Sequence, residues 1–322
     1  MVRWGILGAG NIAHRFAKSL KNEEDSQLYA IALRSEEKAK TFIVQNPCEK
    51  YYLDYQKLID DENVDAIYLS LPHGLHKEWA IKALNNHKAV LCEKPAVINA
   101  QEMREIASVA RKNNVLFMEA MKPRFVPMYS YIKKIINEGV IGNINRIETE
   151  ICFQIVDSNN SNTLTGKTYH TQKGQGGCLL DSGTYCASWL VDYLSEPIKV
   201  TNTDVILMDD IDVYVQSFLS NEKIEARLEV GFDRNKARDA FITGTAGSIH
   251  VFNLHRPEKI EIIKDNKSEI VYVPYENDDF YGEIHHFVQL INSNKTESDI
   301  MSLNDSIMCA TLLDSIRNSF NR

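Results

Sequence analysis

The residues best suited to chemistry follow a short apolar run in the first third of the chain. The run 89–92 has the composition of a buried strand, and Glu93, Lys94 and Pro95 end it together. The carboxyl end of a strand in an open α/β sheet borders the crevice where ligands bind. Pro95 stops strand pairing and favours an extended backbone at Lys94. A lysine ammonium in that crevice could stabilise an alkoxide, although the tripeptide alone also fits a solvated turn.

A second candidate pair, Asp181 and Tyr185, lies in the segment 179–193, which we expect to form one helix. Residues four apart share a helical face, so both side chains would point the same way. A phenol with a pKa near about 10 moves protons at neutral pH only where its phenolate is stabilised, and the Lys94 ammonium could do this. Asp181 could orient Lys94 or bind a substrate hydroxyl. Two questions stay open: whether Lys94 or Tyr185 carries the proton, and whether Asp181 is only a helix cap and Tyr185 only a core aromatic.

The start of the chain carries a glycine motif typical of dinucleotide binding. Gly8 and Gly10 follow a short apolar stretch, and Ala13 completes a G-x-G-x-x-A pattern that opens a helix. Gly8 permits a tight turn, Gly10 lets backbone N–H groups approach a pyrophosphate, and Ala13 allows the helix to pack closely on the strand. We therefore expect Gly8, Gly10, Asn11 and Ile12 to bind a dinucleotide cofactor.

The second predicted strand, 28–33, ends at Arg34 and Ser35 and not at an acidic residue. An NAD-selective site usually has an Asp or Glu here, which binds the ribose 2′-hydroxyl. The planar guanidinium of Arg34 suits a 2′-phosphate, and Ser35 adds a hydroxyl and a helix N-cap. The sequence therefore favours NADP as the cofactor, with NAD as the alternative.

Three more polar or turn-forming residues follow the next predicted strand, 65–71. Pro72, His73 and His76 come soon after it, so we expect them at the same edge of the sheet, in the cofactor site. Strands and helices alternate up to a last strand at 115–118, which predicts an α/β fold with a doubly wound parallel sheet of the Rossmann type. We expect this dinucleotide-binding domain to cover 1–122.

Four motifs, in this order along the chain, resemble the Gfo/Idh/MocA (glucose–fructose oxidoreductase / inositol dehydrogenase) family. They are the glycine turn, the pattern P-H-x-x-H at 72–76, E-K-P at 93–95, and M-E-A-M-K-P-R-F-V-P at 118–127. Each motif is weak alone, and their shared order and spacing make the set specific. The last of them is most similar to the dihydrodiol-dehydrogenase branch of that family.

The resemblance implies an NAD(P)-dependent oxidoreductase that transfers a hydride to or from an alcohol or carbonyl carbon of a sugar, polyol or cyclic diol. Glu93 would meet the nicotinamide ribose, and Lys94 would reach the substrate. The segment 176–185, G-G-x-x-x-D-x-G-x-Y, matches one that brings Asp181 and Tyr185 to the substrate. Arg124 is a candidate for the nicotinamide amide or an anionic group. The competing class is a cofactor-binding regulator without turnover, which would be expected to lack Lys94 or Tyr185.

The second half of the chain, 123–322, predicts an α+β domain for substrate binding and oligomerisation. Alternation at 145–155 indicates a half-buried strand, with Phe153 and Ile155 on the apolar face. A polar segment at 157–177 is long enough to be a functional lid. Seven strand-like runs between 200 and 273 predict a large, mainly antiparallel sheet. A second copy of the chain could cover the open face of this sheet, which would give a homodimer or homotetramer.

The composition and charge of the chain argue against several other classes of protein. The net charge of −8 and the lack of a Lys/Arg cluster argue against nucleic acid as a partner, and no apolar run is long enough for a membrane span. Because Gly8 and Gly10 stand where the apolar region of a signal peptide would lie, we expect no signal peptide. The six cysteines are scattered, which is typical of a reduced, cytoplasmic protein. No Cys/His group has metal-ligand spacing, so we expect no metal site.

Overall fold

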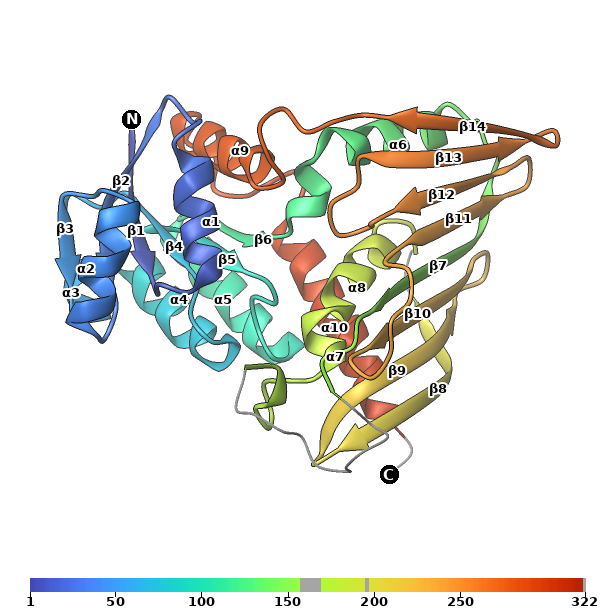
Figure 1. The fold of residues 1–322 in the computed structure, drawn as a ribbon, viewed down its shortest axis with the longest axis horizontal. Helices are drawn as coiled ribbons and strands as arrows, with labels where there is room; N and C mark the ends of the chain where they lie inside the picture. The colour runs from blue at the N-terminus through green and yellow to red at the C-terminus, as the bar shows by residue number, and fades with distance from the viewer. Residues whose placement is uncertain (157–168, 195–196, 321–322) are drawn as a thin grey trace. The chain divides into compact units, whose positions relative to one another are not determined.

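The computed structural model describes residues 1–156, 169–194 and 197–320, and these divide into two compact units (Figure 1). Unit 1 comprises Met1–Val97, Gln101–Phe125 and Glu276–Ile307, and unit 2 comprises Ile98–Ala100, Val126–Tyr275 and Met308–Arg322. This division differs from the expected domains 1–122 and 123–322, because a late segment of the chain, 276–307, folds with the first part. Most of the expected lid, 157–168, lies outside the described residues.

Unit 1 is built on a six-stranded parallel sheet with the strand order β3-β2-β1-β4-β5-β6. The strand order reverses between β1 and β4, and in such sheets the crevice at this switch point is where ligands bind. The strands are β1 (Val2–Leu7), β2 (Ser26–Ala32), β3 (Lys50–Tyr52), β4 (Ala66–Leu69), β5 (Ala89–Glu93) and β6 (Phe117–Ala120). Every residue of β4, β5 and β6 is buried, as expected for parallel strands covered on both faces.

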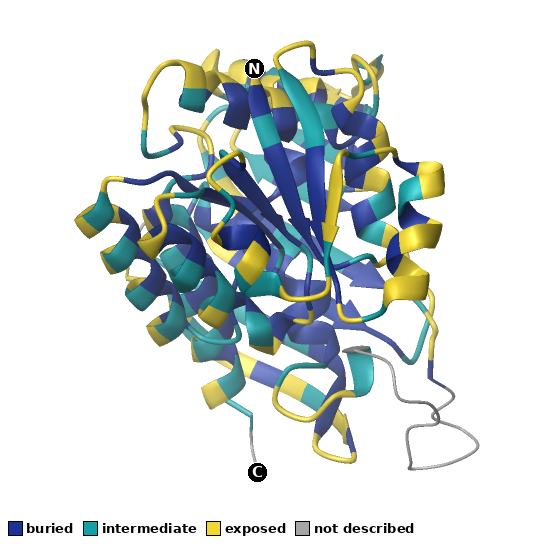
Figure 2. Cartoon of the chain, turned by 90° about the vertical axis from the view of Figure 1, so that its left-hand side faces the viewer, coloured by how far each residue is buried: buried dark blue, intermediate teal, exposed yellow. Residues whose placement is uncertain are grey.

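Helices pack around this sheet with their apolar sides inward, so that the central strands are buried, whereas the outer helix residues and most of the edge strand β3 are exposed (Figure 2). They are α1 (Asn11–Leu20), α2 (Glu36–Gln45), α3 (Tyr55–Ile59), α4 (His76–Asn85), α5 (Ala100–Asn113) and α9 (Tyr281–Asn292), with the short 3-10 helices η1 (His73–Leu75) and η2 (Lys122–Phe125). The doubly wound fold predicted from the sequence is confirmed. The edge strand β3 was not predicted, because it has only three residues and a polar start.

Unit 2 is built on an eight-stranded sheet with the order β14-β13-β12-β11-β7-β10-β9-β8. The pair β7 and β10 is parallel and the other neighbours are antiparallel, so the expected mainly antiparallel sheet is confirmed. The strands are β7 (Ile144–Cys152), β8 (Lys199–Met208), β9 (Ile211–Ser220), β10 (Glu225–Gly231), β11 (Ala240–Gly244), β12 (Ser248–Phe252), β13 (Lys259–Lys264) and β14 (Lys267–Tyr272). The predicted strand 145–155 ends earlier, at Cys152, and Ile155 is 45% exposed.

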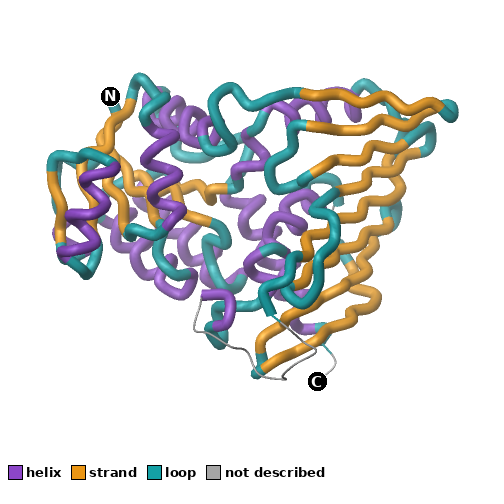
Figure 3. Tube along the Cα trace, viewed as in Figure 1, coloured by secondary structure: helices purple, strands orange, loops and turns teal. Residues whose placement is uncertain are grey.

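Helices cover one face of this second sheet (Figure 3). The helices that lie wholly or partly in unit 2 are α6 (Pro127–Asn137), the 3-10 helix η3 (Tyr169–Thr171), α7 (Cys178–Asp181), α8 (Gly183–Val191) and α10 (Leu303–Asn318). α7 packs on β9 and β10, and α8 packs on β7 and β10, where Trp189 is buried and donates from Nε1 to the carbonyl of Leu254 at 2.9 Å. Within the described residues no helix covers the opposite face. No described helix is long and apolar enough to cross a membrane.

Candidate active site

The turn after β1 has the backbone geometry that the glycine motif predicted. Gly8 has φ of +105°, a conformation that side chains with a Cβ rarely adopt. A Cβ at this position would lie 2.7 Å from the backbone oxygen of Ser70, the residue that follows β4. Ser70 in turn donates from both its backbone N–H and its hydroxyl to the carbonyl of Leu7 at 3.0 Å. The turn is therefore held tightly between the ends of β1 and β4.

The start of α1 is suited to an anion. Gly10 precedes the helix without a side-chain cap, and the first turn has no acidic residue. A Cβ at Gly10 would meet no atom within 4 Å, so the space above the turn is open to a ligand that approaches the backbone. Asn11 is exposed and Ile12 half-buried, whereas Ala13 is fully buried against the sheet. Uncapped N–H groups and the helix dipole favour a phosphate here, so the residues present fit a dinucleotide.

The residues after β2 leave a positive group at the same edge of the sheet. Arg34 is exposed, and Ser35 caps α2 by accepting the Lys38 N–H at 3.4 Å, as the sequence predicted. Glu36, the first acidic residue of α2, forms an ion pair with Lys40 at 2.9 Å, and that ammonium lowers the pKa of Glu36. The expected 2′-phosphate contact of Arg34 and Ser35 is compatible with this exposure.

Pro72, His73 and His76, which we expected in the cofactor site, differ in exposure in the loop after β4. Pro72 is exposed and His73 lies just within the buried class, at 9% exposure. His76 is fully buried, with Nε2 2.6 Å from the carbonyl oxygen of Leu71 and Nδ1 3.0 Å from that of Pro95. Burial lowers the pKa of His76, against the two carbonyl contacts, which raise it. α4 begins at this residue and turns the ring inward, where it joins the loops after β4 and β5. The expected cofactor contact of His76 stays a prediction.

Glu93 and Lys94 separate at the end of β5. Glu93 is buried and accepts hydrogen bonds from the Tyr68 hydroxyl and, at 3.2 Å, from the Lys94 backbone N–H. Burial raises the pKa of Glu93, and the Tyr68 hydrogen bond opposes this rise. Lys94 is half-buried, and its peptide bond to Pro95 is cis. The carboxylate is thus fixed to the neighbouring strand, while the lysine leaves the sheet at its ligand-binding edge.

Arg124 is buried within unit 1, and its expected role at the cofactor stays a prediction. Its side chain is 2% exposed, its Nη1 lies 3.4 Å from Oδ1 of Asp305, and the same nitrogen donates to the carbonyl of Ile300 at 3.1 Å. These contacts bind η2 to the start of α10 within unit 1. A guanidinium buried in this way ties two segments together, so the structure provides no support for a contact with the nicotinamide amide.

Unit 2 holds the other two candidate catalytic residues. Asp181 ends α7 and is buried, with Oδ2 3.8 Å from Nε2 of His170. Tyr185 lies in the first turn of α8 and is half-buried, with its ring centroid 6.0 Å from that of His255. The expected single helix 179–193 is in fact two helices that meet at Ser182.

His170 and His255 were missed by the sequence reasoning. His170 lies in the short helix η3 and His255 in the turn after β12, and only the fold brings them beside Asp181 and Tyr185. The available signal was weak: His170 lies a few residues before the Gly176-Gly177 pair, without a motif of its own. The structure thus groups Asp181 with His170 and Tyr185 with His255 inside unit 2, and it places Lys94 in unit 1. That Lys94 and Tyr185 serve one reaction stays a prediction.

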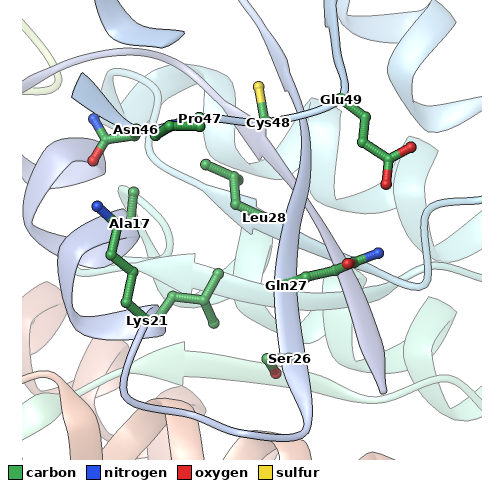
Figure 4. Close-up of a pocket in the computed structure, with 10 residues that line it drawn as sticks. Ala17, Lys21, Ser26, Gln27, Leu28, Asn46, Pro47, Cys48 and Glu49 are labelled. Carbon is green, nitrogen blue, oxygen red and sulfur yellow. The ribbon is translucent and has the colours of Figure 1, made fainter. Parts of the chain in front are cut away.

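A cavity of about 430 Å³ opens elsewhere in unit 1 (Figure 4). It is lined by the end of α1, the start of β2 and the segment 46–49, with Lys21, Gln27 and Asn46 among its side chains. Because the start of β2 is the opposite edge of a parallel sheet from Gly8, this cavity is separate from the site described above.

Two family models match most of the chain. The model described as the oxidoreductase family with an NAD-binding Rossmann fold matches residues 2–121. The model of the GFO/IDH/MocA C-terminal domain matches residues 129–250. The chain belongs to this family. The resemblance carried by the four motifs is therefore confirmed, and the protein is an NAD(P)-dependent oxidoreductase by family.

Characterised relatives match over nearly the whole length. Scyllo-inositol 2-dehydrogenase (NADP(+)) IolU of Bacillus subtilis (strain 168) is 32% identical over 320 residues, which covers 98% of this chain and 96% of the relative. Trans-1,2-dihydrobenzene-1,2-diol dehydrogenase of Xenopus tropicalis is 32% identical over 324 residues, with 97% and 96% covered. Among solved structures, KijD10, a 3-ketoreductase from Actinomadura kijaniata in complex with NADP and TDP-benzene, has a TM-score of 0.88 at 25% identity, with 99% and 97% covered.

Proposed function

We propose that this protein transfers a hydride between nicotinamide C4 and the alcohol or carbonyl carbon of a sugar, polyol or cyclic diol. The observation that carries the proposal is the carboxyl edge of the unit 1 sheet, where the Gly8 turn follows β1 and Lys94 leaves β5, with only β4 between these two strands. The substrate class is supported by relatives named for inositol and for a dihydrobenzene diol.

Gly8, Gly10, Asn11 and Ile12 would hold the pyrophosphate on the N–H groups at the start of α1, and Glu93 would bind the nicotinamide ribose. When bound, the cofactor supplies or accepts the hydride. NADP is the preferred form in this proposal, because Arg34 stands exposed where an NAD-selective site has an acid. A relative named for NADP supports the preference.

Three side chains share the proton chemistry in this proposal. Tyr185 exchanges the proton of the substrate hydroxyl, and the Lys94 ammonium stabilises the negative charge that develops on the oxygen. Asp181, buried beside His170, accepts a hydrogen bond from a second substrate hydroxyl or orients the lysine. Solved structures of the 3-ketoreductase KijD10 include variants with a lysine changed to alanine and with a tyrosine changed to phenylalanine, which fits a role for both residue types in that protein.

The proposal is tested by measuring NADPH fluorescence and oxidation against a panel of polyols, sugars and aldehydes. Turnover of a panel member by the parent protein is expected, whereas cofactor binding without any turnover would favour the regulator. Lys94→Ala should remove most turnover and leave cofactor affinity nearly unchanged. Tyr185→Phe keeps the ring, so its loss of turnover would be chemical. The double variant should be only slightly worse than the worse single variant, because groups that act as one unit lose activity non-additively.

The open face of the unit 2 sheet supports a homo-oligomer, with a second copy of the chain as the proposed cover. Arg227 on this face contacts Glu148 at 2.9 Å and also reaches Glu229, which is fully buried. Aromatic and histidine rings continue the face, with Phe241 and His250 stacked at 4.3 Å. We also propose a cytoplasmic location, which is supported by six cysteines that form no disulfide bond.

A further inference from the structure

The turn that leads into α7 is held by a carboxylate from the neighbouring sheet. Asp212, the second residue of β9, is 9% exposed. Its Oδ2 accepts the backbone N–H of Leu179 at 2.7 Å and the thiol of Cys178 at 3.4 Å. Gly177, which precedes the helix, has no side chain to cap it. Asp212 therefore does the work of an N-cap from a strand that lies 33 residues further along the chain.

Gly176 and Gly177 are required in this turn because neighbouring atoms lie too close to leave room for a Cβ at either position. Gly177 has φ of +102°, and a Cβ there would lie 2.2 Å from Oδ1 of Asp212. A Cβ at Gly176 would lie 2.3 Å from the carbonyl oxygen of His170, and that same oxygen accepts the Gly177 N–H at 2.9 Å. The turn is thus packed between Asp212 on one side and the His170 backbone on the other.

The turn fixes the candidate catalytic residues through a short run of backbone hydrogen bonds. The Asp181 N–H donates to the carbonyl of Gly177 at 3.2 Å, and the Ser182 N–H donates to that of Cys178 at 2.9 Å. The Tyr185 N–H then donates to the carbonyl of Ser182 at 3.2 Å. α7 has only four residues, so its own hydrogen bonds hold it weakly. The anchor at its start decides where Asp181 and Tyr185 stand.

We propose that Asp212 is a positioning residue for the reaction: by clamping the turn 176–179 against β9, it sets the places of Asp181 and Tyr185 without touching the substrate. The inference rests on the proposed function of those two residues. A displacement near 1 Å at a reacting group costs on the order of 100-fold in rate, so loss of the clamp should lower kcat strongly. Cofactor affinity should stay unchanged, because the residues proposed to hold the cofactor belong to unit 1.

The test compares Asp212→Ala, Asp212→Asn and Gly177→Ala with the parent. We expect kcat to fall by about 10- to 100-fold in Asp212→Ala. Asp212→Asn should recover part of the loss, since its amide oxygen can still accept the Leu179 N–H. Gly177→Ala damages the same turn from the other side, so the double variant with Asp212→Ala should be little worse than the worse single variant. The NADPH dissociation constant should stay within about two-fold of the parent value, well below a 1 kcal/mol change.

Asp61→Asn is the matched control. Asp61 is also an aspartate with a little-exposed side chain, at 8%, that accepts a backbone N–H, from Asn63 at 2.9 Å, but it lies in unit 1. Its replacement should lower the melting temperature and leave kcat at the parent value. If Asp212→Ala instead behaves like this control, losing stability with unchanged kcat, the positioning role is overturned.

Hydrogen exchange separates this inference from the proposed function. In Asp212→Ala the amides of 178–186 should exchange at least about ten-fold faster, while those of the unit 1 strands keep their protection. This readout needs no substrate, so it decides on the clamp even if the parent turns over nothing in the panel. Unchanged protection of 178–186 would refute the clamp, whatever the activity.

Discussion

Glu283, in the first turn of α9, is a buried carboxyl group that the proposed reaction does not use. It is 1% exposed, and neither of its oxygens has a hydrogen-bond partner among the residues that the structure describes. The charged groups that act on it are Glu93 on β5, Lys122 on η2, and Asp278 and Asp279 before α9. The Lys122 ammonium donates a hydrogen bond to the Asp279 carboxylate at 2.5 Å. Burial, followed by the nearby Glu93 carboxylate, raises the pKa of Glu283 well above its ordinary value.

This raised pKa makes stability fall as the pH rises. An unfolded glutamate releases its proton near pH 4.3, by roughly the reference value, whereas folded Glu283 keeps it. Above that pH the unfolded state binds one proton fewer, so the free energy of unfolding drops by up to about 1.4 kcal/mol per pH unit. The drop ends only when the pH reaches the raised pKa of the folded protein. Glu283→Gln cannot ionise, so the variant should escape this loss.

Thermal unfolding between pH 5 and pH 7 measures the effect. The melting temperature of Glu283→Gln minus that of the parent should rise by about 3 to 6 °C per pH unit, at roughly 2 to 4 °C per kcal/mol for a chain of this order of size. The control is Glu78→Gln on α4, whose carboxylate is 54% exposed and pairs with Lys82, and it should show no such trend. A difference for Glu283→Gln that stays constant with pH would refute the reasoning, because Glu283 would then ionise equally in both states.

Three further predictions concern cofactor binding by unit 1 and the open face of the unit 2 sheet. Arg34→Asp should cost about 1.5–3 kcal/mol of NADP binding and reverse the preference toward NAD; titrations of both cofactors that match the parent would contradict this. Gly8→Ala should weaken binding of either cofactor and lower the melting temperature, since its φ is +105° and the Ser70 oxygen is 2.7 Å from the new Cβ; parental values in both assays would count against it. Sedimentation should give at least twice the chain mass of 36.7 kDa, and the single-chain mass would exclude the dimer.

Local patterns predicted the parts of the site that depend on local geometry. The Gly8 turn, the Ser35 cap and the end of β5 at Glu93 each follow from residue types within a few positions of one another. The sequence could not predict where the side chains of His76 and Arg124 point. Both directions depend on distant partners: His76 meets the carbonyl of Pro95, and Arg124 meets Asp305 at the start of α10.

The second unit shows the same limit. Alternation predicted its strands well, with Ile147, Thr149 and Ile151 buried on one face of β7. No local signal places β7 between β10 and β11, because that pairing joins residues about 80 positions apart in sequence. The capping of α7 by Asp212 is equally non-local. The helix break at Ser182, by contrast, has a local signal, because Gly183 follows it directly.

Unit 1 also has a consequence for how the protein is made. Its last segment, Glu276–Ile307, supplies Asp279 for Lys122 and Phe287, whose ring centroid lies 5.2 Å from that of Trp4. Lys122 and Asp279 are 157 positions apart, so at 5–20 residues per second the ribosome delivers the aspartate roughly 8 to 30 s after the lysine. During that interval the Lys122 ammonium lacks its ion-pair partner Asp279, and Trp4 lacks its contact with Phe287. A gene fragment ending at residue 122 would thus encode an unfinished domain, and the cofactor-binding half is completed late in translation and not as an independent first step.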